Sequence, residues 1–181
     1  MNVVTTLLPG VLILEPKVFG DDRGFFFESF NRKAFLEATG IDSDFVQDNH
    51  SRSARNVLRG LHYQVRHAQG KLVRVITGEV HDVVVDLRKS SPSFGKHLGL
   101  SLSSGNKRMV WIPPGLAHGF LVLSDHAEFL YKATDFWYPE FERTIAYNDP
   151  DLAISWPLES EPVLSAKDKA GIRFKDAEVS E

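Results

Sequence analysis

The stretch that decides the fold is residues 98–123, which read LGLSLSSGNKRMVWIPPGLAHGFLVL. Its first part, Leu98–Ser103, alternates leucine with small residues, as in a strand that buries one face. A polar turn follows, then the apolar run Met109–Ile112, a Pro-Pro-Gly break and a second apolar run, Gly119–Leu123. Short strands separated by turns in this way are typical of an all-β sandwich or barrel.

Short strand-like segments separated by turns continue on both sides of this stretch. Helix signals are scarce: one short helix is expected over Arg32–Thr39, with Asn31 as its N-cap and Gly40 as its left-handed end. A second helical turn is expected over Ser165–Ala170. Further short runs rich in β-branched and aromatic residues predict strands at Val11–Glu15, Phe25–Phe30, Lys71–Ile76, Val80–Leu87 and Glu128–Ala133.

Length and composition favour one globular domain over residues 1–181. Apolar residues make up 43% of the chain and charged residues 25%, which is enough apolar side chain for one buried core and excludes a disordered or coiled-coil protein. The formal net charge of −3 argues against a protein that coats nucleic acid or an anionic membrane. We therefore expect neither as a partner.

The chain has no cysteine, which excludes a disulfide framework, a thiolate zinc site and a cysteine nucleophile. Residues 1–8 lack the basic segment of a secretory signal, and Pro9-Gly10 interrupts the apolar run far short of the ~20 residues that span a bilayer. A cytoplasmic location is the resulting prediction.

Positive charge is concentrated in one segment, from Asn49 to Gly78, which contains no Asp or Glu. Arginine forms two-pronged hydrogen bonds to phosphate oxygens, so this segment is a reasonable place for a small anionic ligand. A solvated face paired with acidic residues elsewhere in the chain explains the charge equally well. The positive residues are Arg52, Arg55, Arg59, Arg66, Lys71 and Arg74.

Two histidines, His62 and His118, stand next to glycines in strand-like surroundings with few acidic residues. An imidazole there can accept a proton near neutral pH, although a single histidine is more often structural. On strict alternation Arg59 and His62 point to opposite faces of a strand. They share a face only if Gly60 lies in a β-bulge, which the structure can test.

The segment Pro113-x-Gly115-x-x-His118 resembles the second sequence motif of cupin barrels. The first cupin motif normally supplies His-x-His and a nearby Glu, whereas this chain has His62-Tyr63-Gln64 and no Glu before Glu79. A catalytic zinc or iron site needs about three protein ligands. The expectation is a cupin-like jelly roll with no metal.

Other polar and aromatic residues carry weaker signals. Gln47 and Asn49 share a strand face, as residues that orient a ligand do, and so do residues of a polar surface strand. The run Phe136-Trp137-Tyr138 is either a stacking platform or ordinary core packing. Tyr131 alternates with apolar neighbours, and the residues alone do not make it an acid.

Several segments in order along nearly the whole chain resemble the dTDP-4-dehydrorhamnose 3,5-epimerase family. That resemblance implies a metal-free cupin jelly roll that forms a homodimer, in which each subunit extends strands into the sheet of the other. The segments are 22–30 (DRGFFFESF), 47–51 (QDNHS), 57–64 (VLRGLHYQ), 69–75 (QGKLVRV), 111–120 (WIPPGLAHGF) and 131–134 (YKAT).

The resemblance implies an epimerase that converts dTDP-4-dehydro-6-deoxy-D-glucose to dTDP-4-dehydro-L-rhamnose, with no cofactor. A proton leaves C3 and C5, next to the C4 ketone, and returns from the opposite face, so a base and an acid are required. By resemblance His62 is the base, Asp168 holds its far nitrogen, Tyr131 is the acid and Lys71 stabilises the enolate oxygen.

The resemblance also implies the substrate-binding residues. Arg23 and Arg59 take the diphosphate and Trp137 stacks on thymine, while the others line the nucleotide and sugar pocket. Glu140 lies close enough to Glu142 in sequence to be confused with it. The implied set is Arg23, Phe26, Glu28, Gln47, Asn49, Arg59, His118, Trp137, Glu142 and Lys167.

Two other functions stay open on the sequence. The first is an epimerase of another deoxysugar pathway that inverts C3 or C5 alone, because single-site and double-site enzymes share these catalytic residues. The second is a cupin of another kind, either a sugar-binding module without catalysis or a metal-dependent phosphosugar isomerase or dioxygenase. Missing metal ligands argue against the metal enzymes.

Overall fold

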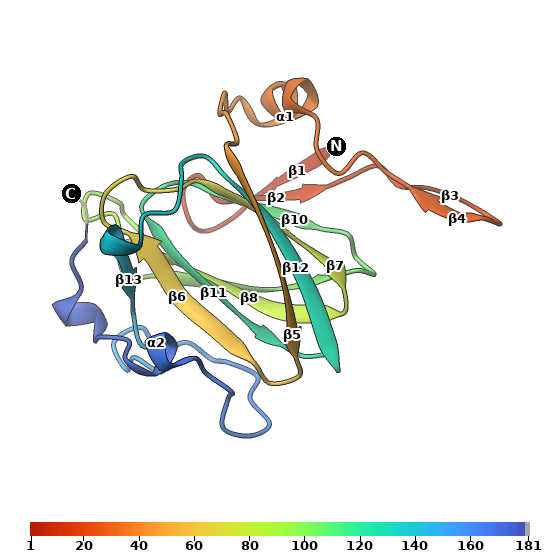
Figure 1. Cartoon of the computed structure of the whole chain (residues 1–181). Coiled ribbons are helices and arrows are strands. Elements are labelled where there is room, and N and C mark those ends of the chain that lie inside the picture. The colour runs from red at the N-terminus through yellow and green to blue at the C-terminus, as the bar shows by residue number, and fades with distance from the viewer. Residues whose placement is uncertain (180–181) are drawn as a thin grey trace.

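The computed structural model describes residues 1–179, and within them two antiparallel sheets face each other (Figure 1). The larger sheet has the strand order β1-β2-β10-β7-β12-β5 and the smaller one β13-β6-β11-β8-β9. The larger sheet consists of β1 (Asn2–Thr5), β2 (Leu12–Glu15), β5 (Gln47–Ala54), β7 (Lys71–Thr77), β10 (Met109–Ile112) and β12 (His126–Ala133). The smaller sheet consists of β6 (Leu58–Gln64), β8 (Glu79–Asp86), β9 (His97–Ser103), β11 (Leu116–Val122) and β13 (Glu142–Thr144).

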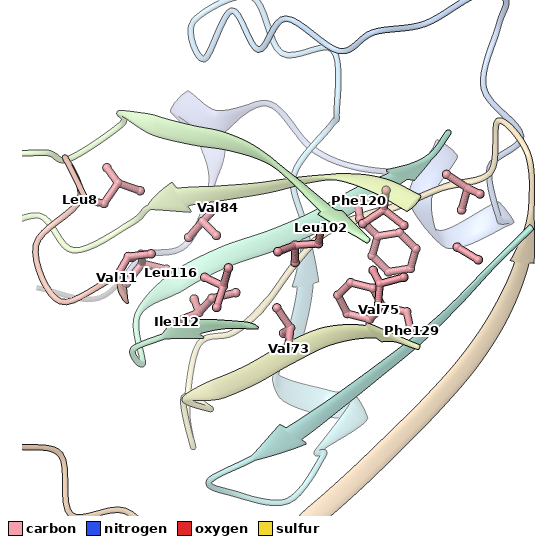
Figure 2. Close-up of a cluster of buried hydrophobic side chains, with 14 residues drawn as sticks. Leu8, Val11, Val73, Val75, Val84, Leu102, Ile112, Leu116, Phe120 and Phe129 are labelled. Carbon is pink, nitrogen blue, oxygen red and sulfur yellow. The ribbon is translucent and has the colours of Figure 1, made fainter. Parts of the chain in front are cut away.

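The main core fills the space between these sheets. Its side chains come from strands of both, and Figure 2 shows Val73 and Phe129 of the larger sheet facing Val84 and Phe120 of the smaller one. Phe120 and Phe129 stack with ring centroids 4.3 Å apart. This arrangement confirms the predicted all-β, cupin-like sandwich.

The outer face of the smaller sheet is covered by the C-terminal segment, which is blue in Figure 1. Val83 and Val85 of β8 pack there against Ile145 and Leu152. Both faces of β8 and β11 are therefore covered, and every residue of these two strands except Glu79 and His81 is buried. The same segment contains α2 (Ala166–Lys169) and ends in a 3₁₀ turn, η2 (Phe174–Asp176).

Helix α1 (Arg32–Thr39) has the predicted bounds and caps. The Asn31 side chain accepts a hydrogen bond from the Ala34 amide at 3.1 Å, and Gly40 is left-handed with φ 73°. Phe35 anchors the helix on the larger sheet against Trp111. The predicted second helical turn is also present, as α2 with Ser165 at its N-cap.

The predicted strand Phe25–Phe30 is largely wrong. Only Gly24–Phe26 (β4) is extended, and it pairs with Phe19–Asp21 (β3) in a hairpin that projects away from the two sheets (Figure 1). Phe30 instead packs against the rings beneath α1, 5.1 Å from Phe45 between centroids. The phenylalanines of this run therefore belong to two different structures, the β3–β4 hairpin and the group of aromatic rings beneath α1.

Five strands were absent from the predicted set: β1, β3 and β13, and, of most interest for the site, β5 and β6. The sequence of β5, QDNHSRSA, has no apolar residue except its last, so no hydrophobic alternation indicates a strand. Strands β5 and β6 both border the cavity described below. In the described part of the chain, no helix has the length and apolar character needed to cross a membrane.

Candidate active site

Two adjoining cavities, of about 310 and 230 Å³, open at one end of the core between the two sheets. The smaller sheet contributes His62 from β6 and Glu142 from β13 to both cavities. The larger sheet contributes Lys71 from β7, Tyr131 from β12 and Asn49 from β5. The cavities thus form one cleft lined by charged and polar side chains from both sheets.

A β-bulge in β6 aims two side chains into this cleft. His62 pairs with His118 of β11, whereas Arg59 pairs with Phe120, so β6 has one residue more than β11 over this interval. Gly60 lies in the bulge at φ 113°, and a Cβ there would meet the His118 carbonyl oxygen at 2.6 Å. Arg59 and His62 both line the larger cavity, which confirms the bulge predicted from the sequence.

His62 is held by a buried carboxylate. Its Nε2 lies 2.5 Å from Asp168 Oδ1, and the Ser165 hydroxyl donates to Asp168 Oδ2 at 2.7 Å. Burial raises the pKa of Asp168, but the hydrogen bonds from His62 and Ser165 outweigh it, so this pKa lies below the ordinary value. An ionised Asp168 keeps a proton on Nε2 and leaves Nδ1 of neutral His62 free to accept one.

Lys71 and Tyr131 lie together on the opposite sheet. The Lys71 ammonium is 5.8 Å from the centroid of the Tyr131 ring. Burial lowers the pKa of Lys71 to about 8, and two nearby charges have smaller effects, since Glu142 raises this pKa and Lys167 lowers it. Burial also raises the pKa of the Tyr131 phenol, and the Glu142 carboxylate raises it further. Tyr131 therefore keeps its proton at neutral pH and is a proton donor.

A second imidazole and carboxylate pair lies at the inner end of the cleft. His118 Nε2 is 2.8 Å from Asp82 Oδ2, and Asp82 is 0% exposed. The Oδ1 atom of Asp82 has no hydrogen-bond partner among residues 1–179. The His118 ring stacks on Phe129, with centroids 5.8 Å apart.

Charged residues line the side of the cleft near α2. Lys167 forms an ion pair with Glu142 at 3.0 Å, and the Arg59 Nε donates to the Ser53 hydroxyl at 2.9 Å. Glu140 lies in the 3₁₀ turn η1 (Pro139–Phe141) and is exposed, outside both cavities. Glu142 is therefore the acidic residue of this loop that belongs to the cleft.

An aromatic and amide surface forms the outer end of the cleft. The Gln47 side chain donates to Asn49 Oδ1 at 3.0 Å and accepts from the Trp137 backbone amide at 3.1 Å. The Trp137 side chain is 54% exposed, unlike a core residue, and lines the smaller cavity. Its indole face is available to stack on a planar ring.

No group of three or more His, Asp or Glu side chains within residues 1–179 has a geometry that could hold a metal ion. His62 and His118, which a cupin metal site would use, each make a hydrogen bond to a different carboxylate. The residues present therefore suit proton transfer and anion binding.

Comparison with known proteins agrees with this geometry. The family model described as dTDP-4-dehydrorhamnose 3,5-epimerase matches residues 5–176. A dTDP-4-dehydrorhamnose 3,5-epimerase of Pseudomonas aeruginosa is 63% identical over 178 residues, which is 98% of each chain. This chain belongs to the dTDP-4-dehydrorhamnose 3,5-epimerase family.

Solved structures of relatives have the same fold. A dTDP-6-deoxy-D-glucose-3,5-epimerase of Legionella pneumophila, in complex with dTDP-4-keto-L-rhamnose, matches with a TM-score of 0.95 and 54% identity, over 97% of this chain and 93% of that one. A 3′-monoepimerase of Streptomyces bikiniensis, in complex with dTDP-quinovose, matches with a TM-score of 0.90 and 34% identity, over 98% of this chain and 89% of that one.

Three residues that the family resemblance placed in the pocket lie elsewhere in this chain. Arg23 and Phe26 belong to the projecting β3–β4 hairpin, and Glu28 follows it. Phe26 is 72% exposed, and Arg23 pairs with Asp21 of its own hairpin. None of the three lines the cleft that contains His62.

Several polar residues of the site were not predicted from the sequence, and two of them, Asp82 and Ser165, bond to predicted site residues. Asp82 is a charged residue directly before the buried apolar run Val83–Val85 of β8, and that contrast was a signal that could have been used. Ser165 was expected only as the first residue of a helical turn. Its bond to Asp168 is local, since Ser165 and Asp168 are the first and fourth residues of an S-x-x-D capping pattern, and that pattern was a second signal that could have been used.

Proposed function

We propose that this epimerase-family chain inverts both C3 and C5 of dTDP-4-dehydro-6-deoxy-D-glucose and so forms dTDP-4-dehydro-L-rhamnose. One observation carries the proposal: His62 and Tyr131 come from strands of different sheets and line the same cavity, with Lys71 beside them. An epimerase needs a base and an acid on opposite faces of a carbon, and this arrangement supplies both.

The proposed reaction begins with removal of a proton next to the C4 ketone. Nδ1 of His62 takes that proton, and the Asp168 carboxylate stabilises the resulting imidazolium. The electron pair of the broken C–H bond moves to the ketone oxygen, where the Lys71 ammonium stabilises the enolate. Tyr131 then protonates the carbon from the other face. Because the substrate ketone accepts the electrons, the mechanism uses no cofactor.

The binding roles follow the polarity of the cleft. Arg59 supplies positive charge for the diphosphate, and the exposed Trp137 indole is the proposed platform for thymine. Gln47 and Asn49 offer amide groups between these two ends. The Legionella relative is in complex with dTDP-4-keto-L-rhamnose, a ligand that combines thymine, a diphosphate and a 4-keto sugar.

The proposed assembly is a homodimer in which the β3–β4 hairpin reaches the cleft of a second copy. The hairpin exposes Phe19, Phe25 and Phe26 by 54%, 63% and 72%, an apolar surface that the chain leaves uncovered. Arg23 and Phe26 then act in the partner's cleft. Nucleic acid and membrane are not expected as partners. We also predict a cytoplasmic location and a single domain over residues 1–181.

The test is conversion of the ketosugar by purified protein, with the product identified by chromatography and proton NMR. We expect formation of dTDP-4-dehydro-L-rhamnose, and a His62→Ala variant that still binds dTDP but forms none. A wild-type protein that binds dTDP-sugars without converting them would establish a binding module instead.

A single-site epimerase is the second function considered, because the Streptomyces 3′-monoepimerase matches this fold over 98% of the chain. The same assay separates the two. A product inverted at one carbon alone would assign this chain to that branch of the family.

A further inference from the structure

The buried pair of Asp82 and His118 has a geometry that parallels the proposed catalytic pair. His62 and His118 are directly opposite each other on β6 and β11, so their side chains share one face and their Cβ atoms lie about 5 Å apart. Each imidazole uses its Nε2 to contact a different carboxylate, Asp168 or Asp82. Two oriented imidazoles therefore border the same small region of the cleft.

Asp82 is positioned so that its side chain orients the His118 ring. On β8 its register partner is Phe120 and the partner of His118 is Val84, so Asp82 and His118 are diagonal neighbours on one face. Asp82 is 0% exposed, and its hydrogen bond to His118 is its only side-chain bond within the described residues. A buried carboxylate with one free oxygen costs stability, so a functional role is the expected reason for its presence.

The hydrogen bond to Asp82 determines which nitrogen of His118 faces the ligand. The Asp82 carboxylate accepts a hydrogen bond from Nε2–H, so the neutral ring presents Nδ1 as an acceptor. Among residues 1–179 this Nδ1 has no hydrogen-bond partner, and His118 lines the larger cavity. Stacking on Phe129 restricts rotation of the ring. An acceptor in this position suits a hydroxyl group.

We propose that Asp82 is a positioning residue that acts through His118, and that the pair binds a sugar hydroxyl rather than the nucleotide. This inference rests on the proposed function, because it takes His62 as the group that reaches the sugar carbons. His118 is the direct neighbour of His62 across the strands, whereas the thymine platform Trp137 lines only the other cavity. The sugar ring, whose carbons His62 reaches, therefore lies nearer to His118 than thymine does, and the diphosphate, assigned to Arg59 of the same cavity, is the part that the dTDP measurement below distinguishes from it.

A double-mutant cycle with Asp82→Asn and His118→Ala tests this coupling, with kcat, KM and dTDP affinity measured for each protein. We expect each single variant to lower kcat/KM on the ketosugar about 10- to 100-fold, the loss typical of one hydrogen bond that involves a charged group. The affinity for dTDP alone should stay within about twofold of wild type. The double variant should be no worse than His118→Ala, because Asp82 acts through that ring.

Asp86→Asn is the matched control, since Asp86 is a fully buried carboxylate four residues further along β8, outside the cleft. Its bonds to Arg88, Ser91 and Ser93 are structural, so its loss should lower the melting temperature and leave kcat/KM unchanged. Multiplicative losses in the double variant, or weakened dTDP binding in Asp82→Asn, would overturn the proposal. Wild-type protein without epimerase activity would refute the proposed function itself.

Nitrogen NMR of the histidines in the wild-type protein gives a second test, which does not depend on whether the Asp82 variant folds. We expect His118 to show a protonated Nε2 and an unprotonated Nδ1, and the Nδ1 signal to move when a dTDP-sugar is added but not with dTDP. A proton on Nδ1 in place of Nε2, or an equal response to dTDP, would contradict the inference.

Discussion

His62 and Tyr131 face one cavity from different sheets, and the chemistry of each depends on a neighbour. Asp168 orients His62, while burial and Glu142 keep the Tyr131 phenol protonated. The histidines and Arg59 were recognisable in the sequence by their setting among glycines and basic residues. The pairing of His62 with Asp168, more than 100 positions away, came only from family resemblance, because no local pattern indicates a contact between two such distant segments.

Replacement of His62 should abolish turnover and spare nucleotide binding. His62→Ala removes the only group proposed as base, and general acid–base catalysis contributes about 10²–10⁴-fold, so kcat should fall by at least this factor. His126→Ala, at the start of β12 and outside both cavities, is the control. Calorimetry with dTDP should give similar affinities for all three proteins. A His62→Ala enzyme with near-normal kcat would remove this residue from the mechanism.

Replacement of Tyr131 should separate exchange from inversion. Tyr131→Phe deletes the acid and keeps the base, so a substrate carbon can still lose its proton to His62 and regain one from the same side. We expect deuterium uptake from solvent to persist at a carbon whose configuration no longer changes, measured by proton NMR. Tyr147→Phe, outside the cleft, should behave as wild type. Loss of exchange together with inversion would contradict the assigned roles.

The lowered pKa of Lys71 predicts an alkaline limit to activity. Because this pKa is about 8, the ammonium that stabilises the enolate is present below pH 8 and is lost above it. The pH profile of kcat/KM should therefore fall above about pH 8. In Lys71→Arg the residual activity should show no such fall, because arginine keeps its charge. If the Lys71→Arg variant lost activity above about pH 8 in the same way, loss of the proton from Lys71 would not be the cause.

The strands of the molecule differ in how far their sequences predict them. β8 to β12 were found because each contains an apolar run or alternation, whereas β5 is polar along almost its whole length. A strand that borders a polar cleft needs polar side chains on its inner face, which removes the periodicity by which strands are recognised. The strand predicted at Phe25–Phe30 is wrong for the opposite reason. This segment is rich in apolar residues, but they do not enter the main core.

The bulge in β6 should be as important for activity as Arg59 and His62, the two residues whose side chains it directs into the cleft. Gly60→Ala places a methyl group 2.6 Å from the His118 carbonyl oxygen at a backbone conformation with φ 113°. Strands β6 and β11 must then separate, and a shift near 1 Å at a reacting group costs about 100-fold. We expect a loss of that size in kcat/KM.

Gly105→Ala is the control for the bulge variant, because the nearest atom to its new methyl group is 3.5 Å away. Its kcat/KM should match the wild type. A Gly60→Ala enzyme of normal activity would show that the bulge does not determine how Arg59 and His62 are presented.

The arrangement of the whole molecule suggests that one chain does not complete its own cleft. Arg23 and Phe26 project on the hairpin away from the two sheets, although the family resemblance assigns both to the substrate (Figure 1). This displacement could not be predicted from one sequence, because a residue that serves a second copy, as we propose for Arg23 and Phe26, has the same local pattern as one that serves its own.

Mixing two inactive variants tests this exchange of hairpins. Arg23→Ala lacks the hairpin arginine and His62→Ala lacks the base, so a mixed dimer contains one complete cleft if the hairpins are exchanged. Co-expression should restore about a quarter of wild-type activity, since about half of randomly assorted dimers are mixed and each has one complete site of two. No recovery in dimers shown to be mixed would mean that each hairpin serves its own chain.

Proton NMR of the ketosugar with purified protein in deuterium oxide tests most simply whether this chain is a double epimerase. If one base and one acid serve both carbons, the C3 and C5 proton signals of dTDP-4-dehydro-6-deoxy-D-glucose will both disappear as deuterium replaces them. Retention of both signals, with the protein folded and binding dTDP, would contradict epimerisation in this cleft.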